Sequence, residues 1–154
     1  METKTVALQG EISPETLELE GIDELVHVTV PLKYELEAQL FDHAVLVQGH
    51  LHLDLQCECA RCLKRYAHSI DVPEWAVHLP LEGEDKVPIQ DDCVDLTPWI
   101  REDILLLFPQ HPLCGTECSG LPNAPLVTEP RGAGQTGMES SAWAALDKLK
   151  FEKE

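Results

Sequence analysis

The chain has 154 residues, 44% of them hydrophobic, which is enough for one domain with its own core but too little for two full domains. Its 28 acidic and 11 basic residues give a formal net charge of -17, so the average surface field repels phosphate backbones and argues against broad binding to nucleic acid. No uninterrupted apolar run reaches the roughly 18 residues of a membrane-spanning helix. No signal peptide opens the chain and the six cysteines are clustered, which favours a cytoplasmic protein with reduced thiols and no membrane partner.

The longest clear pattern starts at Val26, from where every second residue is apolar as far as Leu40. A period of two residues predicts a β-strand. Pro31 falls on the polar positions of this run, which fits an edge strand or a break into two shorter strands. The alternation resumes over residues 45–55 after a tight connection, so the two runs are expected to pair as an antiparallel hairpin.

A third strand is predicted over residues 68–79, where the apolar parity switches at Pro73; a β-bulge there would explain the switch. Thr97 is expected to cap a helix that has Pro98 at its first position and ends before Pro109. The apolar stripe of this helix consists of Ile100, Ile104, Leu107 and Phe108.

These elements predict an α+β fold: an antiparallel β-sheet, able to curl toward a barrel, with two short helices and a cysteine cluster. Residues 1–121 are expected to form the single domain. Residues 122–139 are rich in proline and glycine and predict a flexible linker. Residues 140–154 predict a short amphipathic helix that docks on the domain through Trp143 and the leucines that follow it.

Two cysteine pairs are the most informative chemical feature of the chain. Cys59 and Cys62 are separated by two residues, Cys114 and Cys118 by three, and 51 residues lie between the pairs. Such pairs place two sulfurs on one side of a metal ion, and four thiolates complete the tetrahedral shell of a structural zinc site. The spacing therefore predicts a zinc site with four cysteine ligands, with Cys57 and Cys93 as bystanders. Ordinary reduced thiols packed as small apolar groups are the alternative.

Redox chemistry is a further alternative, since it also uses Cys-x-x-Cys pairs. It needs a thiolate with a lowered pKa, usually in a strand-to-helix turn. Cys59 instead follows a hairpin strand. The sequence contains no phosphate-binding glycine loop, nucleophile elbow or His-Glu-x-x-His motif, so we predict no catalytic residue and no small-molecule substrate.

Three of the 11 basic residues, Arg61, Lys64 and Arg65, lie within five positions of each other at the first cysteine pair. In so acidic a chain this is a local inversion of charge. These residues can neutralise thiolates and pair with nearby carboxylates, or they can form a small surface for an RNA phosphate or an acidic partner. At a Debye length of about 8 Å such a patch acts locally despite the net charge.

Several segments occur in an order and spacing shared with a known family. They are Cys59-Ala60-Arg61-Cys62-Leu63, Val94-Asp95-Leu96, the helix Glu102 to Pro109, Pro112-Leu113-Cys114, Cys118-Ser119-Gly120-Leu121 and Trp143-Ala144-Ala145-Leu146. Through them the chain, from about Gly49 to Leu149, resembles the bacterial YceD family of large-ribosomal-RNA accumulation proteins, which also occur in plastids. One departure is that many relatives follow Gly-Leu with a Cys-Pro-x-Cys pair, whereas here Leu121 leads into Pro122-Asn123-Ala124-Pro125.

The resemblance implies a role in the accumulation of large-subunit (23S) ribosomal RNA or in its assembly, with the four cysteines as metal ligands, and it supplies no known reaction. We therefore expect a non-enzymatic ribosome-assembly factor organised by a structural zinc site. Its expected partner is a basic ribosomal protein or a pre-ribosomal particle of the large subunit, bound through the acidic surface. The competing hypothesis is a thiol redox or metal-carrier protein that uses the two cysteine pairs.

Overall fold

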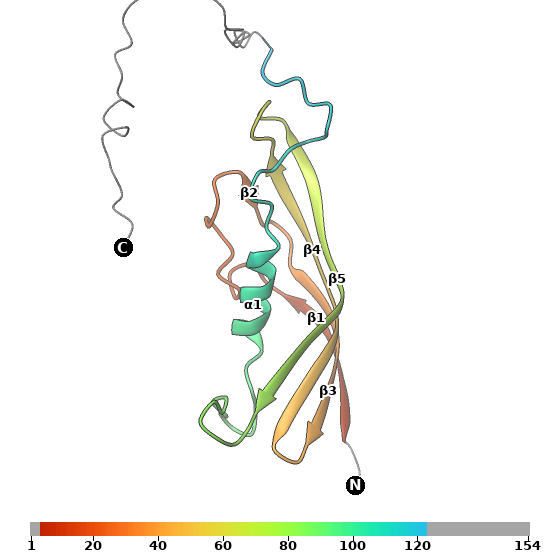
Figure 1. The fold of residues 1–154 in the computed structure, drawn as a ribbon, viewed down its shortest axis with the longest axis vertical. Coiled ribbons are helices and arrows are strands. Elements are labelled where there is room, and N and C mark those ends of the chain that lie inside the picture. The colour runs from red at the N-terminus through yellow and green to blue at the C-terminus, as the bar shows by residue number, and fades with distance from the viewer. Residues whose placement is uncertain (1–3, 123–154) are drawn as a thin grey trace, which may run out of the picture. The chain divides into compact units, whose positions relative to one another are not determined.

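The structure, a computed structural model that describes residues 4–122, is one antiparallel sheet with a helix on one face (Figure 1). Within these residues, no helix has the length and apolar character needed to cross a membrane. The elements are β1 (Thr5–Ile12), β2 (Val26–His27), β3 (Leu32–Phe41), β4 (Ala44–Glu58), β5 (Arg65–Pro80) and α1 (Thr97–Leu106).

Strand β4 is the central element of the sheet. It pairs with β5 along one edge, and along its other edge first with β3 and then, near its end, with β2. The predicted hairpin between the first two apolar runs is therefore confirmed. The first run forms two strands rather than one, because β2 ends at His27 and β3 begins at Leu32, directly after Pro31. This is the break into two shorter strands that the proline predicts.

The predicted bulge is also confirmed. The register of β4 against β5 shifts between Gly49 and Leu51, so that one residue of β4 opposes two residues of β5, one of them Pro73. The extra residue changes the parity of β5. As a result Ile70 and Trp75, which lie on opposite parities in the sequence, are both buried in the core.

Strand β1 is an element that the sequence does not predict. It pairs with β3 over its whole length, from Thr5 opposite Gln39 to Ile12 opposite Leu32. Its residues are exposed except for Ile12, which is half-buried. Val6, Leu8 and Ile12 alternate along the strand, but Val6 and Leu8 remain 45% and 37% exposed, so the position of β1 depends chiefly on its backbone pairing with β3.

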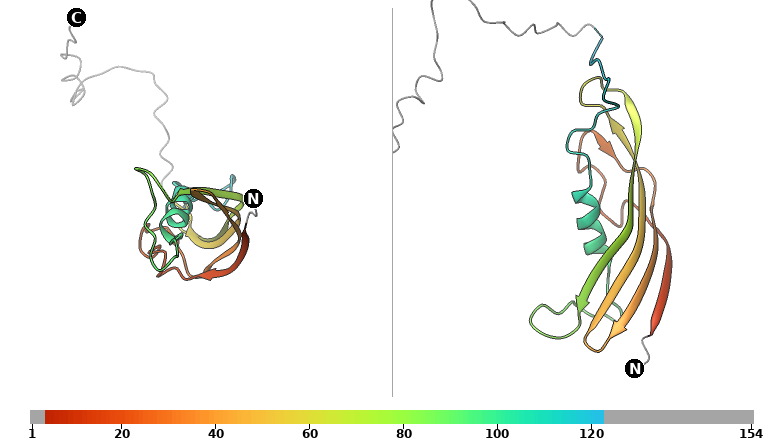
Figure 2. Two further views of the ribbon diagram at one scale, coloured as in Figure 1. Left: turned by 90° about the horizontal axis from the view of Figure 1, so that it is seen from below. Right: turned by 45° about the vertical axis from the view of Figure 1, so that its right-hand side comes forward.

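The expectation of a barrel-like sheet is wrong. Among the described residues β1 pairs only with β3 and β5 pairs only with β4, so both strands are free edges. Seen end-on, the sheet curves around α1 (Figure 2). Helix α1 and residues 13–25 occupy the concave face, where Leu17, Leu19 and Ile104 are almost completely buried. These segments complete the core, so strand closure is not needed to remove its apolar face from water.

Helix α1 is the one helix in residues 4–122. The predicted second helix at 140–154 lies outside the described residues, as do residues 123–139 of the predicted linker.

Helix α1 starts where it is predicted to start, with a proline in its first turn, but Thr97 is not its cap. The cap residue is Leu96, and the backbone N–H of Thr97 donates to Asp95 Oδ1 at 2.9 Å. Hydrogen bonding to the side chain of Thr97, and then to its backbone N–H, lowers the pKa of Asp95.

The helix packs on the sheet through Ile100 and Ile104, and Phe108, just after its end, is buried as well. Leu107, the fourth member of the predicted stripe, is wrongly assigned, because 47% of its surface is exposed. A polar contact adds to this packing, since Trp75 Nε1 of β5 donates to an Asp103 carboxylate oxygen at 2.7 Å.

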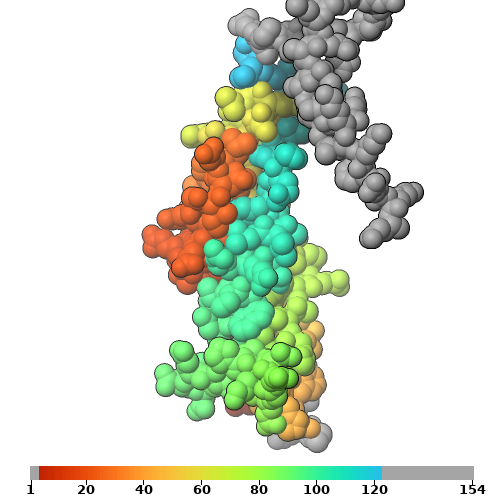
Figure 3. Space-filling model, turned by 60° about the vertical axis from the view of Figure 1, so that its left-hand side comes forward, coloured from red at the N-terminus to blue at the C-terminus, as the bar shows by residue number. Residues whose placement is uncertain are grey.

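Residues 13–25 lie next to α1 on the surface of the molecule (Figure 3). Glu18 of this segment and Arg101 of the helix approach each other at 3.9 Å.

Candidate metal centre

The four cysteines predicted as ligands converge. Their Sγ atoms all lie within 4.8 Å of one another, although the two pairs come from distant parts of the chain. The Sγ–Sγ distance is 3.6 Å between Cys59 and Cys118 and also 3.6 Å between Cys62 and Cys114. Four sulfurs at about 2.3 Å from a tetrahedral zinc ion would lie about 3.8 Å apart. The spacing of the sulfurs therefore fits this metal.

The first pair sits in the turn between β4 and β5. Alternate residues of β4 face the core, and this parity continues past the end of the strand to Cys59, which is fully buried. Two backbone hydrogen bonds close the turn: Leu63 N–H donates to Cys59 O at 2.8 Å, and Cys59 N–H donates to Lys64 O at 2.9 Å. Leu63 has a φ of 60°, a left-handed conformation that this tight turn imposes.

The second pair follows α1, in the segment that returns past the end of the β4–β5 hairpin (Figure 1). The backbone N–H of Ala60, inside the first pair, donates to Pro112 O at 2.8 Å. This bond joins the two ligand segments two residues before Cys114. The two halves of the site are thus held together by the backbone as well as by any shared ion.

The thiols differ in their electrostatic environment. The pKa of Cys59 is lowered to about 6, because the backbone N–H of Cys114, followed by those of Cys62 and Arg61, stabilises its thiolate. The pKa of Cys114 is raised to about 12 by contacts with the sulfurs of Cys62, Cys118 and Cys59. Ionisation of Cys59 is therefore favoured, whereas ionisation of Cys114 is opposed by the neighbouring sulfurs. A divalent cation at the centre would remove this repulsion and allow all four to ionise.

The two bystander cysteines lie outside this group. Cys57 is fully buried in the core, and its burial raises the pKa of its thiol. Cys93 is exposed in a turn where its backbone exchanges hydrogen bonds with Gln90.

Sequence reasoning identified the sulfurs but missed the backbone groups that position them. Pro112 O and the amides around Cys59 have no side-chain signature from which they could have been found.

All three basic residues of the turn are exposed. Arg65 Nε donates to Glu58 Oε1 at 3.1 Å, so Arg65 pairs with a nearby carboxylate. Arg61 and Lys64 make no ion pair with any residue in the range 4–122. Two of the three cations are therefore available at the surface beside the cysteine cluster.

Comparison with known proteins gives relatives of undetermined role. Uncharacterised proteins of Mycobacterium bovis and of two Mycobacterium tuberculosis strains are each 29% identical over 125 residues, which cover 74% of this chain. The chain spans 58% of the length of these relatives. No solved structure matches the chain.

A family model, described as large ribosomal RNA subunit accumulation protein YceD, matches residues 47–150. The match covers more than half of the chain and includes most of β4, all of β5 and α1, and the four cysteines of the cluster. The chain therefore belongs to the YceD family.

Proposed function

We propose that this protein is a non-enzymatic factor that supports the accumulation of large-subunit (23S) ribosomal RNA, and that a structural zinc ion on its four clustered cysteines organises it. The observation that carries the proposal is the family match over residues 47–150. The family description refers to large ribosomal RNA subunit accumulation, whereas the similar mycobacterial proteins are uncharacterised and suggest no reaction.

Zinc is the proposed ion because the donor set is four thiolates with tetrahedral spacing, the usual composition of closed structural zinc sites. Metal binding of this kind supplies on the order of 10 kcal/mol of folding free energy. That is comparable with the whole stability of a typical domain, about 5 to 15 kcal/mol. The ion would hold the β4–β5 turn against the segment that follows α1.

A structural role fits the cluster better than a catalytic one. In a closed four-thiolate site no coordination position remains for a substrate. The lowered pKa of Cys59 would suit thiol redox chemistry, but this side chain is fully buried and cannot meet a substrate from another molecule without opening the turn. We therefore place the redox or metal-carrier function second.

The partner surface that we propose includes the β4–β5 turn. At its tip Leu63 is 56% exposed between two cations, Arg61 and Lys64, that are free of ion pairs within the described residues. An exposed apolar side chain flanked by positive charges suits a local contact with a phosphate-bearing particle. The remaining surface is strongly acidic and suits a basic ribosomal protein.

The test is co-sedimentation of the tagged full chain with precursors of the large subunit, together with measurement of ribosomal RNA after depletion. The proposal predicts that the protein migrates with the precursors and that depletion lowers large-subunit RNA relative to small-subunit RNA. The double variant Arg61→Glu/Lys64→Glu should dissociate from the particle at lower salt. Lys4→Glu/Lys86→Glu, at two exposed lysines outside the β4–β5 turn, is the charge-matched control. Unchanged ribosomal RNA after depletion, or protein found only at the top of the gradient, would contradict the proposal.

A further inference from the structure

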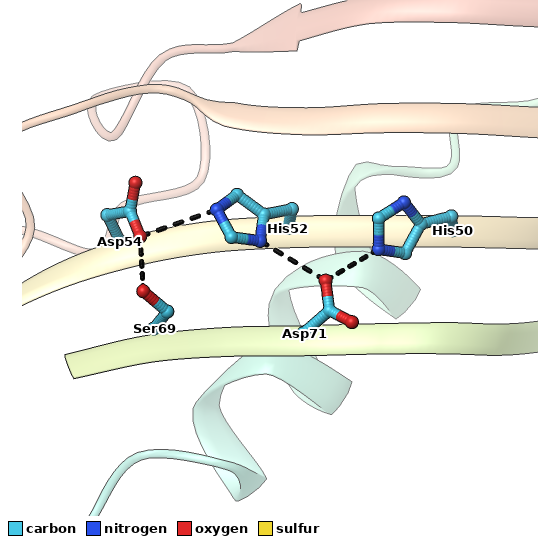
Figure 4. Close-up of polar contacts among 5 residues, drawn as sticks. All are labelled: His50, His52, Asp54, Ser69 and Asp71. Carbon is cyan, nitrogen blue, oxygen red and sulfur yellow. Dashed lines mark hydrogen bonds and ion pairs between the residues drawn. The ribbon is translucent and has the colours of Figure 1, made fainter.

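The outer face of the sheet, opposite α1, carries a row of polar side chains in mutual contact (Figure 4). His50 and His52 are alternate residues of β4, so their rings lie on the same face. Between them lies the Asp71 carboxylate of β5, with one oxygen at 2.6 Å from His50 Nε2 and at 3.2 Å from His52 Nδ1. One carboxylate oxygen is thus shared by two imidazole nitrogens.

The row continues from His52 along the strand. Its second nitrogen, Nε2, lies 3.3 Å from Asp54 Oδ1, and the Ser69 hydroxyl donates to the same Asp54 oxygen at 2.5 Å. Both ring nitrogens of His52 therefore face carboxylate oxygens. A neutral imidazole has one N–H and one lone pair, so it can satisfy only one of these two contacts. The other contact brings two electron-rich atoms together unless the ring is doubly protonated or a cation lies between them.

We propose that this row is a second metal site, in which His50 Nε2, His52 Nδ1 and the Asp71 carboxylate bind a divalent first-row transition-metal ion such as Zn²⁺. Two imidazoles and one carboxylate form a donor set that such ions accept. Asp54 would hold the Nε2–H of His52, which leaves Nδ1 unprotonated and directed at the metal. A carboxylate in this outer position is the usual support of a metal-binding histidine.

The side chains must rearrange to bind the ion. Ligand atoms on a tetrahedral zinc ion lie about 3.4 Å apart, so the Asp71 oxygen, now 2.6 Å from His50 Nε2 and 3.2 Å from His52 Nδ1, has to move away from both nitrogens to make room for it. The side chains of His50, His52 and Asp71 are 42%, 33% and 56% exposed, so they can turn without disturbing the core. The same exposure leaves the fourth coordination position to water.

Strand β3, which pairs with β4 beside this row, adds little to its net charge. On β3 Lys33 is opposite His52 and Glu35 is opposite His50, one charge of each sign. The two aspartates of the row thus remain the main local charges, and they favour a cation. The site is independent of the cysteine cluster, which lies beyond the end of β4 and uses different residues.

The experiment is a Zn²⁺ titration of the full chain, purified with its cysteine site occupied, in which ¹⁵N shifts of the histidine ring nitrogens are followed by NMR at pH 7.5. This readout reports each histidine separately, whatever the state of the cysteines. We expect selective, saturable shifts at His50 Nε2 and His52 Nδ1, and one additional bound zinc ion in equilibrium dialysis.

Variants test the assignment. His50→Asn and His52→Asn should each abolish the additional equivalent, and Asp54→Asn should weaken it about 10- to 100-fold as expected for an outer support. His78→Asn, at an exposed residue of the same sheet that pairs with Leu46, is the control and should bind normally. If both rings are doubly protonated and their shifts do not respond to Zn²⁺, the row is a proton-bridged network and the proposal is wrong. Retention of the additional equivalent in His52→Asn would also refute it.

Discussion

At the scale of single residues, the chemistry of this protein is concentrated in side chains whose neighbours change their charge. The Cys59 thiolate is stabilised by backbone amides, whereas the same cluster opposes ionisation of Cys114. On the outer face the Asp71 carboxylate has a lowered pKa, chiefly because of its hydrogen bond to His50 and then that to His52. In both places anionic groups are packed closely enough that a cation would be bound favourably.

The first prediction concerns one sulfur of the cysteine cluster. Cys62→Ser should leave well below one zinc ion per chain after desalting, because a hydroxyl is a poor substitute for the fourth thiolate. Its apparent unfolding midpoint should fall, since the metal no longer contributes folding free energy. Metal analysis measures the zinc content, and thermal unfolding measures the midpoint, for Cys62→Ser and for the parent chain.

Cys93→Ser is the matched control, because that cysteine is exposed and lies outside the cluster. It should retain zinc and stability like the parent chain. A parent chain that is free of zinc yet fully stable would disprove the structural role of the metal.

At the scale of elements, β4 positions both candidate sites. Its inward residues lead through the core to Cys59, and its outward residues include His50 and His52. It can do so because neighbouring strands bind it on both edges along most of its length. The bulge opposite His50 sets which residues of β5 face the histidines, so Asp71 reaches them only with the register that is observed.

The second prediction tests this close pairing. Gly49 has a φ of 152°, and a Cβ placed there would lie 2.1 Å from the backbone oxygen of Glu35 on β3. Gly49→Ala must strain the backbone and push the strands apart, so we expect a loss of about 1 to 3 kcal/mol of unfolding free energy. Urea denaturation of the variant and of the parent chain measures this difference in unfolding free energy.

Gln48→Ala at the adjacent exposed position is the control, and it should change the unfolding free energy by less than about 0.5 kcal/mol. An equally stable Gly49→Ala variant would show that β3 and β4 are not paired so closely.

At the scale of the whole described domain, stability comes from one curved sheet covered on its concave face by α1 and residues 13–25. The buried residues of the two layers form a single apolar cluster that includes Leu17, Leu51, Trp75 and Ile104. The free edges β1 and β5 follow from this arrangement, because the helix takes the place that closing strands would occupy in a barrel.

The third prediction distinguishes the two sides of α1. Ile104 is fully buried, so Ile104→Ala should cost about 2 to 5 kcal/mol through lost burial and the cavity that remains. Leu106 is 75% exposed on the same helix, and Leu106→Ala should have almost no effect. Equal effects of the two substitutions in chemical denaturation would mean that the helix does not pack on the sheet as described.

Much of the fold and of the metal centre could be predicted from the sequence, because these features depend on patterns of residues close together in the chain. Alternating apolar residues identify β3, β4 and β5, the parity change at Pro73 identifies the bulge, and Pro98 marks the start of the helix. The spacing of Cys59 with Cys62 and of Cys114 with Cys118 reflects the geometry of a metal shell, so it identifies the cluster without knowledge of the fold.

Other features were decided only by the tertiary structure, because they depend on contacts between segments that have no local signature. Strand β1 is held at an edge by its backbone pairing with β3, and its short alternation of Val6, Leu8 and Ile12 does not show which strand it joins. The cap residue is Leu96 rather than Thr97, and the backbone N–H of Ala60 donates to the carbonyl of Pro112 from the other half of the chain. His50 and His52 appear in the sequence as polar residues of a strand, and only the register of β5 brings Asp71 between them.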